Sequence, residues 1–177
     1  MAVSVVFETH SITEDNEAGV ATGWLPGRLS AHGRELAVAL GERRRADDLA
    51  AVLSSDLRRA AETASLAFPS GRPQVLLDWR LRECDYGQLN GAPRQAVLGD
   101  RAAHLTVPYR DGESWTEAVE RVAGVLPDVA VRWAGRRVLI VGHVATWWAL
   151  EHRLRGRPLD DLADAPFRWQ EGWEYVL

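Results

Sequence analysis

The chain has 177 residues, 46% of them hydrophobic, which suffices for one substantial core but is short for two independent domains. Its 21 basic and 25 acidic residues give a net charge of -4 and are spread along the chain, without the basic patch that nucleic-acid binding requires. All 21 basic residues are arginine, which excludes a Schiff base or a phosphate loop built on lysine. We therefore expect one domain over residues 1–177 that does not bind nucleic acid and recognises any phosphate through Arg, His or backbone amides.

Cysteine content and hydropathy indicate where the protein works. Cys84 is the single cysteine, and the N-terminal residues run directly into a strand without an export signal. No apolar run approaches the roughly 18 residues that a membrane-spanning helix needs. We expect a cytoplasmic protein without a membrane partner.

The first third of the chain predicts two strands separated by a helix. Val3–Phe7 is an apolar, β-branched run, typical of a strand that is buried on both faces. Ser30 can cap a helix over about 31–44, and Ala51–Ser54 is expected to be a second strand.

The next helix has an unusual beginning. Ser55 or Asp56 is expected to cap it, which places Arg58 and Arg59 in its first turn. Cations in that position oppose the helix macrodipole. Their presence indicates a role other than stabilising the helix.

The middle of the chain is less regular. Gln74–Asp78 is a candidate third strand, and residues 92–113 are expected to form a covering loop with some helix. Ser114 opens a capping box and a helix toward Trp133, which Pro127 should kink or divide.

The C-terminal part completes an alternating pattern. Val138–Val141 is a buried strand, a helix follows over about 145–154, and the tail 167–177 can add an edge strand. Strands that alternate with helices predict an α/β three-layer sandwich, in which a mostly parallel central sheet carries helices on both faces. Ligands of such folds bind beyond the carboxyl ends of the strands.

Two histidines directly follow predicted strands. His10 comes after the first strand and His143 after the strand 138–141, so neighbouring strands would place both at one sheet edge. Arg59 and Glu83 follow two further strands, and all four are expected to meet there. The turn beyond His10 adds two polar side chains, Thr13 and Asn16.

Six ordered motifs resemble the histidine phosphatase superfamily, which includes the phosphoglycerate mutases. They are Thr9–Asn16, Leu29–Gly33, Ser55–Ala64, Leu81–Gly87, Gly112–Ser114 and Val138–His143. The resemblance covers nearly the whole chain and implies a phosphoglycerate mutase-like fold.

The resemblance also implies a mechanism. His10 would attack phosphorus and form a phosphohistidine, which water then hydrolyses. Arg59 and His143 would stabilise the phosphoryl oxygens, and Glu83 would protonate the leaving oxygen and then deprotonate water. Asn16 could donate a hydrogen bond to phosphate, and neither a metal nor a cofactor is required.

Three positions depart from the family's Arg-His-Gly-Glu motif, where this chain has Thr9, His10, Ser11 and Ile12. Thr9 removes a phosphate-binding cation, which corresponds to about 1.5–3 kcal/mol, or one to two orders of magnitude in phosphate affinity. The side chains expected around the substrate are Thr9, Ser11, Thr13, Asn16 and Arg58. The arginines that could replace the missing cation are Arg58, Arg82, Arg110 and Arg137.

Other site chemistries have less support. A Cys84 nucleophile would need an arginine six positions later, where the chain has Asn90, so a packed thiol is the better interpretation. No serine-hydrolase, phosphate-loop or dinucleotide motif is present, and the histidine spacing does not specify a metal site.

The eight tryptophans favour packing over a binding platform. Trp147 and Trp148 point about 100° apart on a helix, so one is expected in the core while the other lines a possible homodimer interface. Trp24 and Trp115 lie in or near the predicted site loops, where they could contact an organic leaving group.

The leading hypothesis is a phosphatase that hydrolyses a small phosphomonoester, because the set of His10, Arg59, Glu83 and His143 is complete and the extra length that mutases use around the site is absent. Two alternatives stay open. One is an unusual family enzyme whose phosphate pocket is rebuilt around Thr9, and the other is a catalytically silent binding protein. Substrate identity depends on loop side chains that the sequence does not place.

Overall fold

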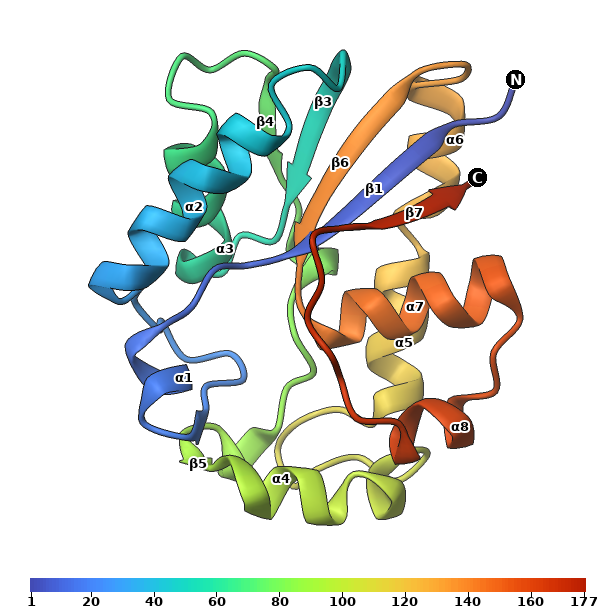
Figure 1. Cartoon of the computed structure of the whole chain (residues 1–177). Coiled ribbons are helices and arrows are strands. Elements are labelled where there is room, and N and C mark those ends of the chain that lie inside the picture. The colour runs from blue at the N-terminus through green and yellow to red at the C-terminus, as the bar shows by residue number, and fades with distance from the viewer.

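The computed structural model describes all 177 residues and has a five-stranded sheet at its centre (Figure 1). The strand order is β4-β3-β6-β1-β7. The strands are β1 (Ser4–Thr9), β3 (Leu49–Ser54), β4 (Val75–Leu77), β6 (Arg137–Gly142) and β7 (Trp173–Val176). All neighbours pair in parallel except β7, which pairs antiparallel with β1 at the edge. The predicted mostly parallel sheet and its C-terminal edge strand are confirmed.

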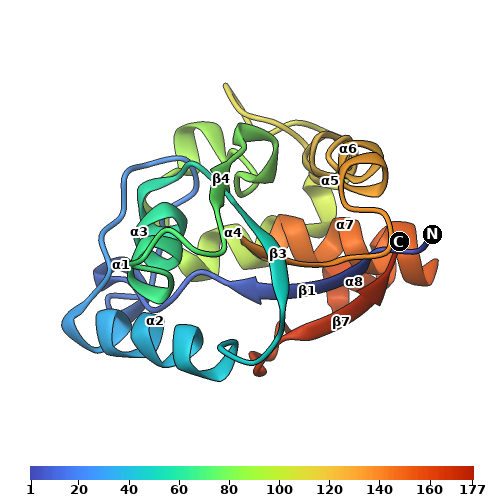
Figure 2. The same cartoon turned by 90° about the horizontal axis from the view of Figure 1, so that it is seen from above.

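Helices cover both faces of the sheet, as Figure 2 shows from above. One face carries α2 (Ala31–Arg43) and α3 (Arg58–Ala67), and the other carries α5 (Trp115–Ala123), α6 (Leu126–Arg132) and α7 (Val144–Arg155). Alternate residues of one strand face different layers. In β6, Leu139 packs with α2 and α3, whereas Ile140 packs in the cluster that contains α5 and α7. The expected three-layer sandwich is therefore confirmed.

Shorter elements lie beyond the carboxyl ends of the central strands (Figure 1). These are α1 (Glu14–Glu17), a small sheet of β2 (Val20–Ala21) and β5 (Ala92–Pro93), and α4 (Arg94–Asp100). The remaining elements are α8 (Leu159–Asp164), which packs on α7, and the 3-10 turns Trp79–Leu81, Gly87–Leu89 and Ala102–His104. The predicted covering segment over 92–113 thus contains one helix and one 3-10 turn.

Two predicted helix starts are confirmed, and one is wrong. The Ser30 hydroxyl accepts the Gly33 amide hydrogen at 3.0 Å, and Ser114 forms the predicted capping box. Helix α3, however, has Leu57 at its N-cap without a side-chain cap. Ser55 instead accepts the Leu57 amide hydrogen in the preceding turn, and Asp56 is occupied by an ion pair with Arg82.

The tryptophan pair is buried as a whole. Trp147 is 7% exposed and packs edge-on against Phe167, while Trp148 is fully buried against Trp115. The expectation that one of the two lies free for a subunit interface is wrong, because the chain's own C-terminal segment covers Trp147.

No helix in the structure is both long and apolar enough to cross a lipid bilayer.

Candidate active site

The sheet register brings the two predicted histidines together. Thr9 at the end of β1 pairs with Gly142 at the end of β6, so His10 and His143 follow neighbouring strands. The His10 amide donates to the Gly142 carbonyl at 2.9 Å, and the imidazole centroids lie 5.0 Å apart. The two imidazoles therefore lie side by side at this edge of the sheet, as the sequence predicts.

A hydrogen bond fixes which ring nitrogen of His10 carries the hydrogen. Its Nδ1 lies 2.7 Å from the Ser11 carbonyl oxygen, which can only accept, so Nδ1 carries the hydrogen. The lone pair is then on Nε2. Burial and the nearby Arg59 charge lower the pKa of His10 to about 3, against the raising effect of that hydrogen bond. At neutral pH this imidazole is therefore uncharged.

His143 presents a hydrogen-bond donor. Its Nδ1 lies 3.4 Å from Nη2 of Arg59, which is always a donor, so Nδ1 accepts and the hydrogen is on Nε2. Nε2 is buried and has no partner in the protein. Burial and the Arg59 charge hold the pKa of His143 well below its usual range. An unpartnered buried donor needs an acceptor, and a bound oxyanion can supply one.

Arg59 connects the histidines to a loop. It is 2% exposed, and its Nη1 and Nη2 donate to the carbonyls of Leu25 and Gly23 at 3.3 and 2.8 Å. Gly23 has φ +54°, and a Cβ there would lie 1.8 Å from the Asn90 Oδ1. The first-turn cation that opposes the dipole of α3 therefore organises the loop 22–27 around the histidine pair.

Glu83 lies at the N-terminus of α7. Its Oε1 accepts from the amides of Cys84 and Ala145 at 2.9 and 3.0 Å, and its Oε2 accepts from Val144 at 3.3 Å. These last two amides are the first of the helix that begins beside His143, where the macrodipole favours a carboxylate. Glu83 thus borders the same site, with its carboxyl group held by three backbone amides.

The polar turn after His10 is mostly engaged within the protein. The Ser11 hydroxyl donates to the Gly33 carbonyl at 2.6 Å, and the buried Thr13 hydroxyl accepts the Asn16 amide hydrogen. Asn16 is exposed, and its Oδ1 accepts from the Thr13 amide. In the free protein, Thr13 and Asn16 cap α1, and these contacts leave the side-chain NH₂ group of Asn16 available to donate.

Three of the arginines considered as replacements for the lost cation are engaged elsewhere. Arg58 is half-exposed and extends toward Glu62, and Arg82 forms a two-bond pair with Asp56. Arg137 is at the first residue of β6, the opposite end of the strand from His143, so its candidacy is wrong. The fourth, Arg110, is on the exposed surface.

The two loop tryptophans differ. Trp115 is completely buried against Trp148, so its predicted contact with a leaving group is wrong. Trp24 is partly buried, and its Nε1 donates to the Glu83 carbonyl at 2.7 Å. Trp24 therefore borders the site through the backbone of Glu83.

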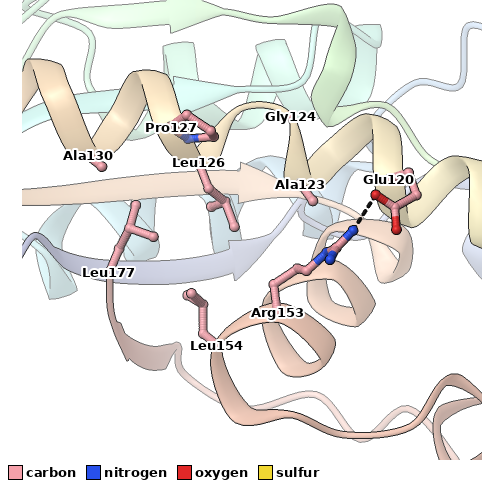
Figure 3. Close-up of a pocket in the computed structure, with 9 residues that line it drawn as sticks. All are labelled: Glu120, Ala123, Gly124, Leu126, Pro127, Ala130, Arg153, Leu154 and Leu177. Atoms are coloured by element: carbon pink, nitrogen blue, oxygen red, sulfur yellow. Dashed lines mark hydrogen bonds and ion pairs between the residues drawn. The ribbon is translucent and has the colours of Figure 1, made fainter.

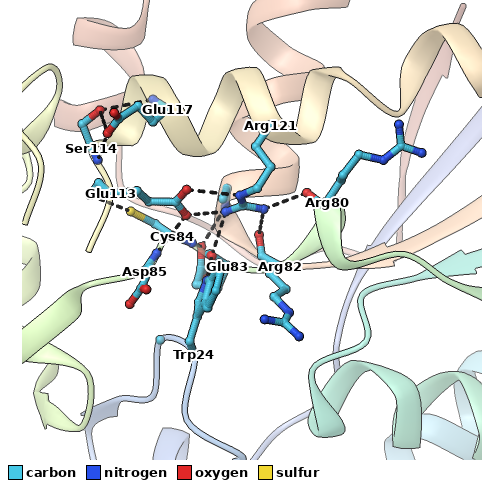
Figure 4. Close-up of polar contacts among 12 residues, drawn as sticks. Trp24, Arg80, Arg82, Glu83, Cys84, Asp85, Glu113, Ser114, Glu117 and Arg121 are labelled. Carbon is cyan, nitrogen blue, oxygen red and sulfur yellow. Dashed lines mark hydrogen bonds and ion pairs between the residues drawn. The ribbon is translucent and has the colours of Figure 1, made fainter. Parts of the chain in front are cut away.

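The sequence reasoning missed Arg121. Its guanidinium, on α5, binds the Glu113 carboxylate and backbone carbonyls just before and at Glu83 (Figure 4). Nothing distinguishes Arg121 from the other arginines in the sequence, although Glu113 lies in the Gly112–Ser114 motif.

A separate groove lies away from these residues (Figure 3). It has a volume of about 510 Å³ and runs between α5, α6, α7 and the C-terminal Leu177. Most of its lining is apolar, with the Arg153–Glu120 ion pair at one end. It contains none of the histidines and no nucleophile.

The buried histidines predict a loss of stability in acid. An unfolded histidine titrates near pH 6.5, whereas folded His10 does so near 3, so between these values the unfolded chain binds the additional proton. Unfolding free energy should therefore fall as the pH drops below 6.5, and His10 alone should account for at most about 2 kcal/mol at pH 5. Urea unfolding at pH 7 and pH 5 should show a smaller pH effect in His10→Gln than in the wild type. An identical pH effect in both would contradict a His10 that is neutral in the folded protein.

Comparisons with known proteins agree with this geometry. A family model described as the histidine phosphatase superfamily (branch 1) matches residues 6–170. The Salmonella arizonae protein named probable phosphoglycerate mutase GpmB is 30% identical over 168 residues, covering 88% of this chain and 76% of the relative. The glucosyl-3-phosphoglycerate phosphatase of Mycolicibacterium vanbaalenii is 33% identical over 174 residues, covering 89% and 76%. The structure of a mycobacterial glucosyl-3-phosphoglycerate phosphatase with VO3 has a TM-score of 0.81 at 26% identity, covering 92% of this chain and 87% of the other.

The fold and the paired imidazoles define an α/β enzyme of the phosphoglycerate mutase-like class. The chain belongs to the histidine phosphatase superfamily.

Proposed function

We propose that this protein hydrolyses a small phosphomonoester through a phosphohistidine on His10. The observation that carries the proposal is the hydrogen bond from His10 Nδ1 to the Ser11 carbonyl, since it leaves Nε2 free to attack. The unpartnered Nε2–H of His143 and the guanidinium of Arg59 lie beside it and suit the three oxygens of a phosphoryl group.

The reaction divides into two displacements. His10 Nε2 attacks phosphorus, the bond from phosphorus to the ester oxygen breaks, and Glu83 gives a proton to the departing alkoxide. Water then attacks phosphorus, the N–P bond breaks, and Glu83 takes the proton from the water. In this scheme Glu83 gives up a proton in the first step and regains one in the second.

The named relatives support phosphoryl chemistry but differ in acceptor. One is named as a phosphatase, which transfers the group to water, and another as a mutase, which returns it to an organic acid. The geometry described above serves either acceptor. Hydrolysis is proposed because Glu83 can activate water without any further group.

Phosphate release from a panel of phosphomonoesters tests the proposal. Rapid alkali quenching with a labelled ester should trap a phosphoprotein that is stable in alkali and labile in acid, and chelators should leave the rate unchanged. If no ester in the panel releases phosphate while the protein still binds inorganic phosphate, the result would instead indicate a binding protein.

Thr9 supports a second candidate, a family enzyme whose pocket is rebuilt for an unusual metabolite. Three of the four arginines that could compensate are engaged with Glu62, with Asp56 or at the far end of β6. The space of the missing guanidinium is then available to the substrate itself.

A substitution separates a lost phosphate ligand from a rebuilt pocket. Thr9→Arg is expected to lower turnover of the best ester in the panel by about tenfold, because the new side chain fills substrate space. Thr9→Val, which keeps the volume, is the control and should change turnover little. Tighter inorganic phosphate binding together with faster turnover in Thr9→Arg would show that the pocket had simply lost a ligand.

A further inference from the structure

We propose that Arg121 is a positioning residue for this reaction: it fixes the backbone of residues 80–83 and so sets where Glu83 presents its carboxyl group. The inference rests on the proposed function, in which Glu83 exchanges protons with the leaving group and water. Arg121 acts through Glu83.

The Arg121 guanidinium binds three backbone carbonyls of residues 80–83 (Figure 4). Nη1 donates to the carbonyls of Arg80 and Arg82 at 2.7 and 3.1 Å, and Nη2 donates to the Glu83 carbonyl at 3.1 Å. The Arg121 side chain is only 9% exposed. Water therefore has little access to replace these bonds.

Glu113 connects Arg121 to the chain on the other side of Glu83. Its carboxylate pairs with Nε and Nη2 of Arg121, and its Oε1 accepts the Asp85 amide hydrogen at 3.0 Å. The segment that carries Glu83 is thus held before and after that residue by one partly buried ion pair.

Trp24 links this clamp, the Arg121–Glu113 ion pair, to the phosphate side of the site. Its Nε1 donates to the Glu83 carbonyl, and its ring lies beneath Arg82 and Arg121, 4.7 and 5.7 Å from their guanidinium carbons. Arg59 holds the carbonyls on either side of Trp24, those of Gly23 and Leu25. The groups proposed to bind phosphate and to exchange the proton are therefore built on one connected scaffold.

The chemistry of arginine explains why this position needs a guanidinium. A planar fork with five N–H donors can satisfy three carbonyls and a carboxylate together, whereas an ammonium has three donors and no fixed plane. Without it the carbonyls of residues 80–83 lose their partners and the segment can shift. A displacement of about 1 Å at a catalytic group can cost about 100-fold in rate.

The test compares leaving groups. Arg121→Lys is expected to lower the single-turnover rate of phosphoprotein formation from an alkyl phosphate by about 30- to 100-fold, and that from an activated aryl phosphate, which needs little protonation, by less than about fivefold. Inhibition by inorganic phosphate should be unchanged, since its proposed ligands are intact. In a Glu83→Gln background, adding Arg121→Lys should change the alkyl rate by less than about twofold.

Arg153→Gln is the matched control. It removes another arginine paired with a glutamate of α5, Glu120, but does not touch residues 80–83, so neither ester should be affected. If Arg121→Lys does not fold, Glu113→Gln tests the other half of the clamp with the same two esters.

Two results would overturn the inference: equal losses on both ester classes, or losses that add fully to those of Glu83→Gln. Either result with a normal wild-type phosphoenzyme would refute the positioning role alone. Absence of a wild-type phosphoenzyme would refute the proposed function.

Discussion

His10→Ala is expected to lower turnover of any phosphomonoester by about 10⁴-fold or more and to eliminate the acid-labile phosphoprotein. The substitution removes Nε2, the ring nitrogen that the backbone hydrogen bond of Nδ1 leaves free, on an imidazole whose centroid lies 5.0 Å from that of His143. Loss of the imidazole should not unfold the protein, because His10 is partly exposed and follows the end of β1.

The measurement is the single-turnover formation of phosphoprotein, followed by steady-state phosphate release. His32→Ala is the control, since the His32 side chain is 60% exposed and contacts only the surface residue Glu35. Its rates should match the wild type. Undiminished phosphate release from His10→Ala would exclude nucleophilic catalysis by this residue.

Much of the fold is predictable from local pattern. The runs Val3–Phe7 and Val138–Val141 are apolar at successive positions because each strand has a helical layer on both faces. Ser30 and Ser114 reveal their helices because capping involves residues only three positions away. The start of α3 is different, since a long-range pair with Arg82 engages Asp56.

The site is predictable only where topology places it. Residues at the carboxyl ends of neighbouring parallel strands must meet, which is why His10 and His143 could be paired from the sequence. The sequence assigns Thr13 to the substrate, whereas in the structure it caps α1, because a hydroxyl that caps a helix and one that binds a ligand have the same sequence pattern. The contacts of Arg121 with residues 80–83 could not be predicted for another reason. These partners are backbone carbonyls about 40 residues away, and carbonyls have no sequence signature.

Glu83→Gln is expected to lower kcat for alkyl phosphates by about 10²- to 10³-fold while leaving phosphorylation by an activated aryl ester nearly unchanged. The amide cannot protonate a poor leaving group, but an aryl oxide needs no proton to leave. Glutamine retains one oxygen to accept the Ala145 and Cys84 amide hydrogens, and its NH₂ group would face the Val144 amide, so some adjustment is expected there.

The second step gives this variant its most specific signature. Glu83 is also the proposed base for water, so the phosphoprotein formed from the aryl ester should persist, and a burst of phenol should precede slow phosphate release. Glu120→Gln, a surface carboxylate on α5, is the control and should show no burst beyond that of the wild type. Equal losses for alkyl and aryl esters, without accumulated phosphoprotein, would mean that Glu83 does not exchange the proton. Its three amide contacts would then have only a structural role, joining the chain after β4 to the start of α7.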